Sequence, residues 1–258
     1  MIRVYSKNFF LFYLCGRRKF SSSMDWLSTY ENATEFYNDA NRRWPQNKSQ
    51  PPGKWILGSY DDESIIVYQA YNSNIAKYAS ENHRFIGCPD YNRKRMTWIK
   101  TNFLWMMYRS QWATAPNQEH ILAIWLRRSA FERYLAQALH STHKGLPEES
   151  EEKSAKDRTD SSLIRLQWDP DHHPHGTSVP GRRAIQLGLK NVEKFLDGSD
   201  IIRIVDITSF VQKQYQNAVL PKERLDQLRV PIEHIYVPAD EQTCVHIHLD
   251  SWKEDNEE

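Results

Sequence analysis

The sequence predicts an α+β fold, a single domain in which helices flank a mixed, mainly antiparallel sheet. Apolar, β-branched runs alternate with amphipathic stretches, but they do not follow a regular strand–helix–strand rhythm. The chain also lacks a glycine-rich phosphate loop, which argues against a doubly wound parallel sheet. Its 258 residues, 40% of them hydrophobic, suffice for one large domain, which we place at residues 25–250.

Enrichment in β-branched and aromatic residues predicts the strands. We expect strands over residues 64–71, 95–101, 120–126, 163–168, 184–189, 201–207, 232–237 and 244–249. The run HILAIWL at 120–126 is continuously apolar, which is typical of a strand buried on both faces. Side chains alternate along a strand, so Tyr68 and Ala70 should face one side of the strand 64–71, and Gln69 and Tyr71 the other.

Amphipathic spacing and capping residues predict the helices. We expect helices over residues 25–43, 72–80, 102–112, 129–140, 191–196 and 208–218. Asn72 is suited to cap the second of these, in which Ile75, Ala76 and Ala79 form one apolar face. The segment KSQPPG at 48–53 has the composition of a turn or linker.

Charge and composition also distinguish three segments, two at the ends of the chain and one within the domain. Residues 1–24 contain bases but no acid, so we interpret them as a basic leader, with a mitochondrial presequence as its targeting form. Residues 147–162 predict a disordered acidic loop, and residues 251–258 an acidic tail. The 3 cysteines are far apart, which favours a reducing compartment. We therefore expect a cytoplasmic protein, with the mitochondrial matrix as the alternative.

The overall charge and hydropathy exclude some classes of partner. A formal net charge of +1 argues against a protein whose main role is bulk adhesion to nucleic acid or to membranes. The longest apolar run, Phe9–Cys15, is far shorter than the roughly 20 residues that span a bilayer. We expect no membrane partner, and the sequence leaves the oligomeric state open.

A basic, aromatic segment between Tyr91 and Gln118 contains no acidic residue. Its charged and aromatic members are Arg93, Lys94, Arg95, Trp98, Lys100, Phe103, Trp105, Tyr108, Arg109 and Trp112. Arginine forks bind phosphate, and flat aromatic faces stack on bases or on a nicotinamide ring. The segment therefore predicts a cleft for a nucleotide or nucleic acid. The alternative is a core strand and helix, with tryptophans as filling and arginines at the rim.

Several strings of residues resemble one family. They are VYQAY (67–71), RMTWIK (95–100), NFLWMMYRS (102–110), QEHILAI (118–124), QWDPD (167–171) and RRAIQLGL (182–189). Over roughly residues 50–215 the chain resembles the domain-of-unknown-function family DUF4291. It departs from that pattern at Gln111, where the family usually has glycine, and at residues 115–117, where it often has Lys-Pro-Gly. The family name implies one domain and no particular activity.

The order of these segments is also similar to that of ADP-ribosyltransferase-like folds, in which a first strand and helix shape a nicotinamide pocket. The resemblance implies NAD as the cofactor and cleavage of a glycosidic bond through an oxocarbenium-like state that an acid stabilises. Glu119 is the acid nearest to the basic segment and would be the catalytic residue, with a surface charge at a strand end as its alternative role. The usual Arg or His of the first strand is absent, and Gln69 or Tyr71 would take its place.

The same resemblance implies a set of binding residues. Arg95, Lys100 and Arg109 would hold pyrophosphate or nucleic-acid phosphates, and Tyr71 or Trp98 would stack on a ring. The other candidates for the ligand site are Gln69, Tyr108, Ser110, Asp169, Arg183 and Gln186. Arg183 and its neighbour Arg182 could instead form a solvated strand edge.

Two histidine-containing segments offer different chemistry. The run from Asp169 to His175 (DPDHHPH) combines imidazole and carboxylate groups that suit zinc or iron, but prolines interrupt the ligand spacing. His246 and His248 would face the same side of the last predicted strand, most simply toward solvent. We expect no metal site. The alternatives to an NAD-dependent enzyme are a non-catalytic RNA- or DNA-binding module and a metal-assisted hydrolase that uses the Asp169–His175 loop.

Overall fold

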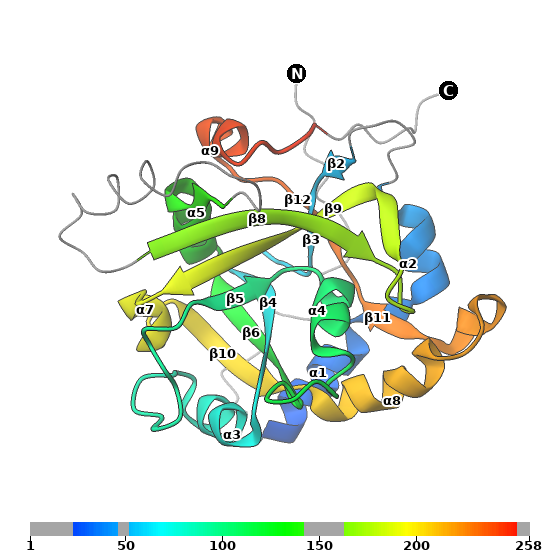
Figure 1. The fold of residues 1–258 in the computed structure, drawn as a ribbon, viewed down its shortest axis with the longest axis horizontal. Coiled ribbons are helices and arrows are strands. Elements are labelled where there is room, and N and C mark those ends of the chain that lie inside the picture. The colour runs from blue at the N-terminus through cyan, green and yellow to red at the C-terminus, as the bar shows by residue number, and fades with distance from the viewer. Residues whose placement is uncertain (1–22, 46–51, 142–162, 252–258) are drawn as a thin grey trace, which may run out of the picture.

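The computed structural model describes residues 23–45, 52–141 and 163–251. It confirms the predicted fold class, because helices flank an 8-stranded mixed sheet in one α+β domain (Figure 1). The predicted acidic loop at 147–162, most of the predicted leader and most of the predicted tail lie outside the described residues. No helix among the described residues is both long and apolar enough to cross a bilayer.

The strands of the large sheet follow the order β10-β6-β4-β5-β9-β8-β7. They are β4 (Ser64–Tyr71), β5 (Thr97–Lys100), β6 (His120–Arg127), β7 (Leu139–His140), β8 (Leu163–His172), β9 (Ser178–Lys190) and β10 (Ile201–Asp206), and β2 (Gly53–Lys54) pairs with β9. Of these strands, β2 and β7 pair in parallel and the others pair antiparallel. Two small sheets pair β1 (Thr34–Phe36) with β11 (Arg229–Pro231) and β3 (Ile56–Gly58) with β12 (His234–Tyr236).

The helices include one that begins at the predicted cap, Asn72. They are α1 (Ser23–Asn32), α2 (Tyr37–Arg43), α3 (Ser73–Asn82), α4 (Phe103–Ser110), α5 (Arg128–Gln137), α7 (Glu193–Leu196), α8 (Thr208–Ala218) and α9 (Glu241–His246), with a 3-10 turn at η1 (Lys222–Gln227). The Asn72 side chain accepts a hydrogen bond from the Ile75 backbone N–H at 3.0 Å, as predicted for α3. Asn102 caps α4 in the same way through the Trp105 N–H at 2.7 Å.

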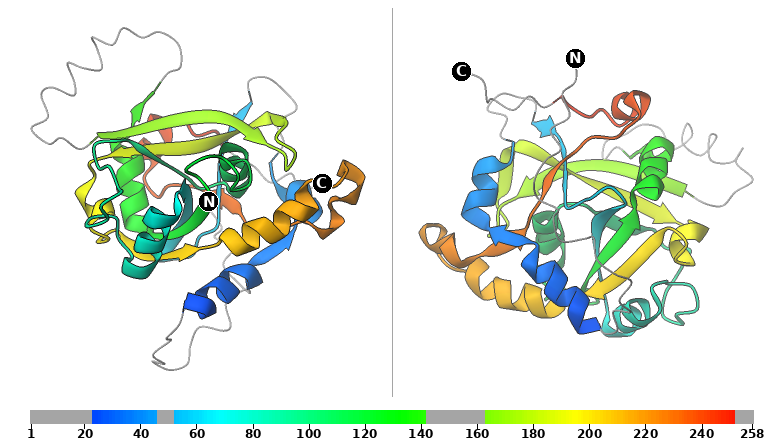
Figure 2. Two further views of the ribbon diagram at one scale, coloured as in Figure 1. Left: turned by 60° about the horizontal axis from the view of Figure 1, so that its bottom comes forward. Right: turned by 180° about the vertical axis from the view of Figure 1, so that it is seen from behind.

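Alternation along β4 divides the core into two apolar clusters, one on each face of the strand. Val67 and Tyr71 belong to the first cluster, with residues of α3, α5 and α7, whereas Tyr68 and Ala70 belong to the second. The second cluster lies against α1, α2, α4 and α8, and Figure 2 shows the blue helices α1 and α2 beside the gold helix α8. The predicted split of the strand 64–71 into two faces is thereby confirmed.

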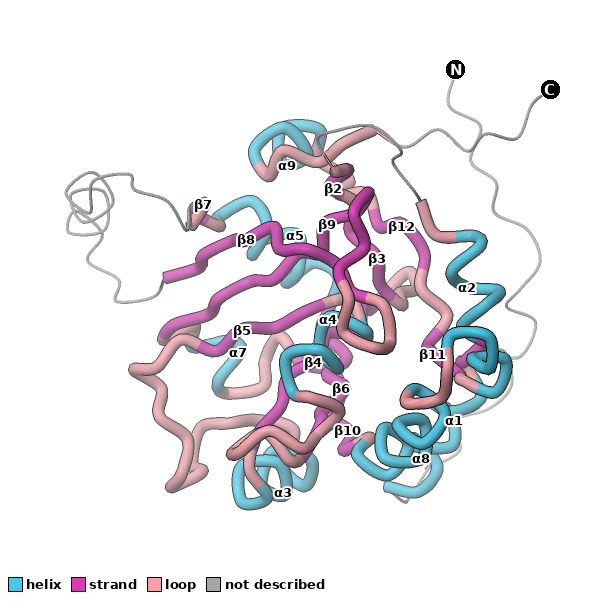
Figure 3. Tube along the Cα trace, turned by 45° about the vertical axis from the view of Figure 1, so that its right-hand side comes forward, coloured by secondary structure: helices cyan, strands magenta, loops and turns pink. Residues whose placement is uncertain are grey.

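The second cluster does not extend over the other half of the sheet. Ile99 on β5, Ile185 and Leu187 on β9 and Leu166 on β8 belong to the first cluster, and no residue of these three strands belongs to the described part of the second. These three strands run next to each other with α4 at their side (Figure 3). The face of β5, β9 and β8 that points away from the first cluster is therefore available for polar residues.

Two predicted elements are wrong. The helix expected over 25–43 is interrupted because residues 34–36 pair with β11. The strand expected over 244–249 is replaced by α9, because the Asp240 carboxylate accepts the backbone N–H groups of Gln242 and Thr243 and so starts a helix. His246 and His248 therefore do not share a strand face, and His246 instead donates to the carbonyl of Ala138 at 2.7 Å.

Candidate functional site

A cavity of about 830 Å³ lies where β4 and β5 part from each other. Among the described residues these strands pair only at Tyr68 and Lys100; beyond that bridge β4 runs on to Tyr71, opposite the beginning of β5. The cavity is bordered by these strands, by β8 and β9, by α3 and α4, and by the loops at 90–96 and 116–118. Segments that are far apart in the sequence thus meet at one opening in the sheet.

A row of polar side chains crosses β5, β9 and β8 at this cavity. Lys100 is paired with Gln186, and Gln186 with Gln167, so the three share one face of the sheet. Gln186 Nε2 donates to Gln167 Oε1 at 2.9 Å and to Asp169 Oδ2 at 2.6 Å. Ile185, the neighbour of Gln186, belongs to the apolar core. The polar side chain of Gln186 is tolerated in this apolar strand because it points away from the core, into which its neighbour Ile185 packs.

On the same face of the sheet, Trp98 is paired with Gly188, and Trp98 borders the cavity. A Cβ at Gly188 would lie 3.0 Å from the Trp98 ring and 2.5 Å from Met96 Sδ. The glycine therefore lets both side chains lie close over β9. Because Trp98 is half-buried and borders the cavity, its indole presents a flat apolar surface there.

Lys100 is almost fully enclosed, with 3% of its surface exposed. Its Nζ donates to the Trp98 carbonyl at 2.6 Å and to Gln69 Oε1 at 3.5 Å. Burial and the positive charge of Arg109 lower the pKa of Lys100 from 10.5 to about 7, while the Asp169 carboxylate acts in the opposite direction. A substantial fraction of this amine is therefore uncharged at neutral pH, which allows it to act as a base or a nucleophile.

Thr97 bridges β4 and β5 after their backbones have parted. Gln69 Nε2 donates to Thr97 Oγ1 at 3.1 Å, and the hydroxyls of Tyr71 and Thr97 share a hydrogen bond of 2.7 Å. Burial raises the pKa of Tyr71 well above its ordinary value, so its hydroxyl stays protonated. These side-chain bonds replace backbone pairing at the edge of the cavity.

Two exposed guanidinium groups and a buried indole complete the wall. Arg95 precedes β5, and Arg109 lies in the last turn of α4. Trp105 is 5% exposed and stacks on His172, with the ring centroids 5.1 Å apart. Its Nε1 is buried and has no hydrogen-bond acceptor among the described residues. Two guanidinium groups at one cavity are a feature that suits phosphate oxygens.

Most of the predicted binding residues border this cavity. They are Gln69, Tyr71, Arg95, Trp98, Lys100, Arg109, Asp169 and Gln186. The other three have different surroundings. Tyr108 stacks on His172 at a centroid distance of 3.6 Å, Ser110 Oγ donates to the Met106 carbonyl inside α4, and Arg183 lies on β9 beside the short strand β2. The basic segment is thus divided between the cavity and the packing around it.

Glu119, the predicted catalytic acid, is not among the residues that border the cavity. It is exposed, and its Oε1 accepts a hydrogen bond from the Asn117 N–H at 2.8 Å. It thereby shapes the loop whose residues Asn117 and Gln118 do border the cavity. The carboxylates that border the cavity are Asp90, which is exposed, and Asp169, which is 8% exposed.

Among the cavity residues that the sequence did not predict are Gln167, Asn72 and Tyr91. Gln167 had a usable signal, because it is a polar residue between two apolar ones in a predicted strand, just as Gln186 is. Asn72 was recognised only as a helix cap. Tyr91 reaches the cavity through the loop before β5, whose path follows from tertiary contacts and not from a local pattern.

The histidines of the Asp169–His175 segment contact separate partners. His172 stacks on Trp105, His173 Nδ1 shares a 2.9 Å hydrogen bond with the Tyr37 hydroxyl, and His175 donates to a backbone carbonyl. Across the part of the chain that the structure describes, His, Cys, Asp and Glu side chains form no group of three that could hold a metal ion. The metal-assisted hydrolase therefore has no ligand set in this segment.

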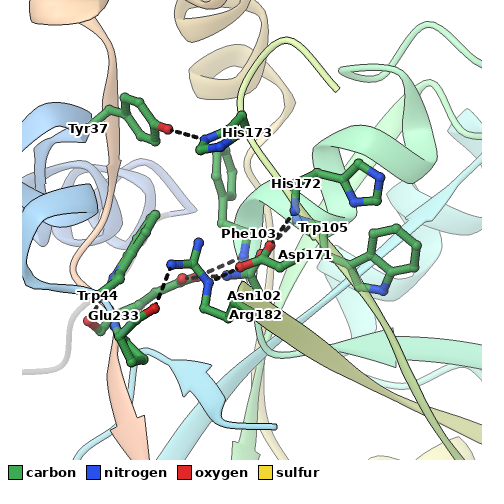
Figure 4. A network of polar contacts seen from close by, with 11 residues as sticks. Tyr37, Trp44, Asn102, Phe103, Trp105, Asp171, His172, His173, Arg182 and Glu233 are labelled. Carbon is green, nitrogen blue, oxygen red and sulfur yellow. Dashed lines mark hydrogen bonds and ion pairs between the residues drawn. The ribbon is translucent and has the colours of Figure 1, made fainter. Parts of the chain in front are cut away.

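A buried charge network lies beside this segment and fixes the start of α4 (Figure 4). Arg182 and Asp171 form an ion pair in which each residue is 1% exposed. Glu233 accepts hydrogen bonds from Asn102 Nδ2 at 3.0 Å and from the Phe103 N–H at 2.7 Å. Burial raises the pKa of Glu233 to about 8. The network holds in place the helix that carries two cavity residues.

Comparison with known protein families gives one match. The family described as Domain of unknown function (DUF4291) matches residues 55–236, against the resemblance expected over roughly 50–215. The matched span begins just before β3, ends with β12 and includes every residue that borders the cavity. No curated protein matches the chain.

Proposed function

The chain belongs to the DUF4291 family, and because that name assigns no activity, we propose from the cavity itself that this protein binds a nucleotide. The expected ligand is a small anion with a flat ring. NAD is the most specific form of the proposal, since it carries a pyrophosphate between two ring-bearing ends.

The observation that carries the proposal is the convergence of unlike groups on one cavity. Trp98 offers a ring surface, Arg95 and Arg109 offer positive charge, and Gln186 belongs to a row of amides. Nucleotide sites combine apolar ring surfaces with a few placed polar groups in a concave space of this size. The chain as a whole is almost neutral, with a net charge of +1, so the positive charge is a local feature of the cavity.

We extend the proposal to ADP-ribosyltransferase-like chemistry on NAD. The end of β4 and the first turn of α3 border the cavity, which is the arrangement that the sequence resemblance implies for a nicotinamide pocket. Asp169 is better situated than Glu119 to stabilise a developing oxocarbenium ion, because it borders the cavity and is buried. Under this proposal, Gln69 or Tyr71 takes the place of the usual first-strand Arg or His.

Thermal unfolding tests this proposal. Wild-type protein is heated with NAD, with ATP and with a single-stranded RNA of twelve nucleotides. A ligand that binds only the folded state raises the melting temperature, by roughly 5 °C at a concentration one hundred times its Kd. We expect stabilisation by NAD, its loss in Arg109→Ala, and its retention in Arg93→Ala. The control residue Arg93 belongs to the same basic segment but pairs with Glu193 outside the cavity.

Each alternative has its own outcome. Stabilisation by RNA with none by NAD would favour the nucleic-acid-binding module. Equal NAD stabilisation of wild type and Arg109→Ala would remove Arg109 from the site. If none of the three ligands changes the melting temperature, the nucleotide proposal is wrong.

A further inference from the structure

We propose that Lys100 is an amine nucleophile that forms an imine with the aldehyde of an anionic ligand held in the cavity. The inference rests on the proposed function, because the same cavity must accept an anion with a sugar or ring. It adds a covalent step and a substrate class. The expected ligands are sugar phosphates and nucleotides whose sugar has a free anomeric carbon, since such sugars open to aldehydes in water.

The position of Lys100 supports this assignment. It lies at the backbone bridge between β4 and β5, beyond which the strands part, and it borders the cavity while only 3% of its surface is exposed. Its Nζ donates to two neutral oxygens, those of the Trp98 carbonyl and the Gln69 amide. A lysine whose only role was surface charge would lie on the outside, with its ammonium group in water.

The charges around Lys100 favour the neutral amine that imine formation requires. Arg109 on α4 and burial lower the pKa of Lys100 to about 7, and Asp169 on β8 opposes them. The facing side chains on β4 and β9 are the uncharged amides of Gln69 and Gln186. An ordinary exposed lysine, with a pKa near 10.4, has far less neutral amine at pH 7.

The chemical step is balanced without an oxidant, a reductant or a metal. The Nζ lone pair attacks the aldehyde carbon, and the C=O double bond becomes the C–O bond of a carbinolamine. The carbinolamine then loses its oxygen as water, which takes both protons of the original amine. The product has an Nζ=C double bond in place of the C=O double bond.

Reductive trapping tests the proposal. The protein is incubated with ADP-ribose and, separately, with pyridoxal 5′-phosphate, which combines a phosphate, a flat ring and an aldehyde. Sodium borohydride then adds hydride to any imine carbon, and peptide mass spectrometry locates the stable secondary amine. We expect the adduct on Lys100 in wild type and in the control Lys94→Arg, but not at position 100 in Lys100→Arg. Lys94 is an exposed lysine on the adjacent loop. Excess ADP, which has no aldehyde, should reduce the labelling of Lys100 at least tenfold.

The pH profile separates a reactive amine from accidental labelling. The trapping rate at Lys100 should be half-maximal near pH 7, about three pH units below the value for a free lysine amine in a model peptide. Labelling spread over the exposed lysines, or a rate at Lys100 that still rises toward pH 10, would overturn the assignment.

The thermal shift with ADP reports on the cavity independently of the amine. If ADP stabilises wild type but Lys100 gives no adduct, the imine inference is wrong and nucleotide binding stands. If Lys100 is trapped by pyridoxal phosphate while ADP neither stabilises nor protects, the nucleotide proposal is wrong and the amine assignment stands.

Discussion

A single side chain, Lys100, links the stability of the domain to its proposed chemistry. Its pKa in the folded protein, about 7, is below the ordinary value of 10.5, so the folded state binds fewer protons than the unfolded state between these values. Burial of the amine therefore lowers the free energy of unfolding. The full decrease applies below pH 7, and it disappears as the pH rises toward 10.5. Strongly perturbed pKa values of this kind cluster at functional sites.

Replacing Lys100 by methionine should therefore stabilise the protein without ligand. Methionine keeps the length of the side chain and removes the charge, so we expect a gain of roughly 2 kcal/mol in the unfolding free energy at pH 6. The gain should become smaller by pH 9.5. Urea unfolding at both pH values measures it, with the exposed Lys77→Met as the control. A loss of stability at both values would show that Lys100 is held as a favourable charge.

Glu233 provides a second pH-dependent contribution, of the opposite sign. Its pKa rises from 4.5 to about 8, so the folded state binds more protons than the unfolded state in this window, and stability should fall as the pH rises through it. The glutamine side chain of the variant Glu233→Gln cannot ionise. We therefore expect its unfolding free energy to decrease between pH 5 and 8 by roughly 1–2 kcal/mol less than that of the wild type. Urea unfolding at these two values measures the change, and the exposed Glu81→Gln should behave as wild type. An unchanged slope in Glu233→Gln would mean that this carboxylate ionises normally in the folded protein.

At the scale of elements, the edge of the cavity depends on the side-chain hydrogen bonds that join β4 and β5 where their backbones do not pair. Thr97 replaces missing backbone pairing with hydrogen bonds to Gln69 and Tyr71. Thr97→Val keeps the shape but removes the hydrogen bonds to Gln69 Nε2 and to the buried Tyr71 hydroxyl, which should cost about 2 kcal/mol of stability. Thr97→Ser retains the hydroxyl and should lose less. Urea unfolding compares the two variants, and equal losses would show that the methyl group of Thr97 matters more than its hydrogen bonds.

The sequence predicted several elements from local determinants. Asn72 caps a helix as predicted, and the alternation along 64–71 reproduces the two observed faces. The prediction for 244–249 was wrong because a short capping interaction by Asp240 outweighed strand propensity. The helix over 25–43 was wrong for the opposite reason, since pairing with β11 is a long-range contact.

The same distinction applies to the cavity residues. Residues on strand faces, such as Gln69, Lys100 and Gln186, could be recognised from polarity within apolar strands. Glu119 was chosen for its nearness in sequence to the basic segment, but its side chain turns to the backbone of its own loop. Whether a side chain borders the cavity there depends on the path of the loop, which one sequence does not specify.

At the scale of the whole molecule, the cavity exists because apolar packing covers only part of one sheet face. The cluster against α1, α2, α4 and α8 reaches β4, β6 and β10, whereas β5, β9 and β8 contribute to the other cluster. The composition or periodicity of a single segment does not predict which strands the helices cover, because this coverage depends on where several helices pack together. The result is a concave site with local positive charge on a nearly neutral domain.

This distribution of charge predicts a weak salt dependence for any nucleic-acid binding. Three cations, Arg95, Lys100 and Arg109, border the cavity. If each contacts one phosphate of a single strand, the logarithm of the affinity should fall with the logarithm of the salt concentration with a slope of about −2 at most. Fluorescence anisotropy of a labelled twelve-nucleotide RNA between 50 and 500 mM NaCl measures this slope. We also expect NAD to displace the RNA, because both ligands would need the same cavity. A slope steeper than about −4, or RNA that NAD does not displace, would instead indicate a second, extended nucleic-acid surface outside the cavity.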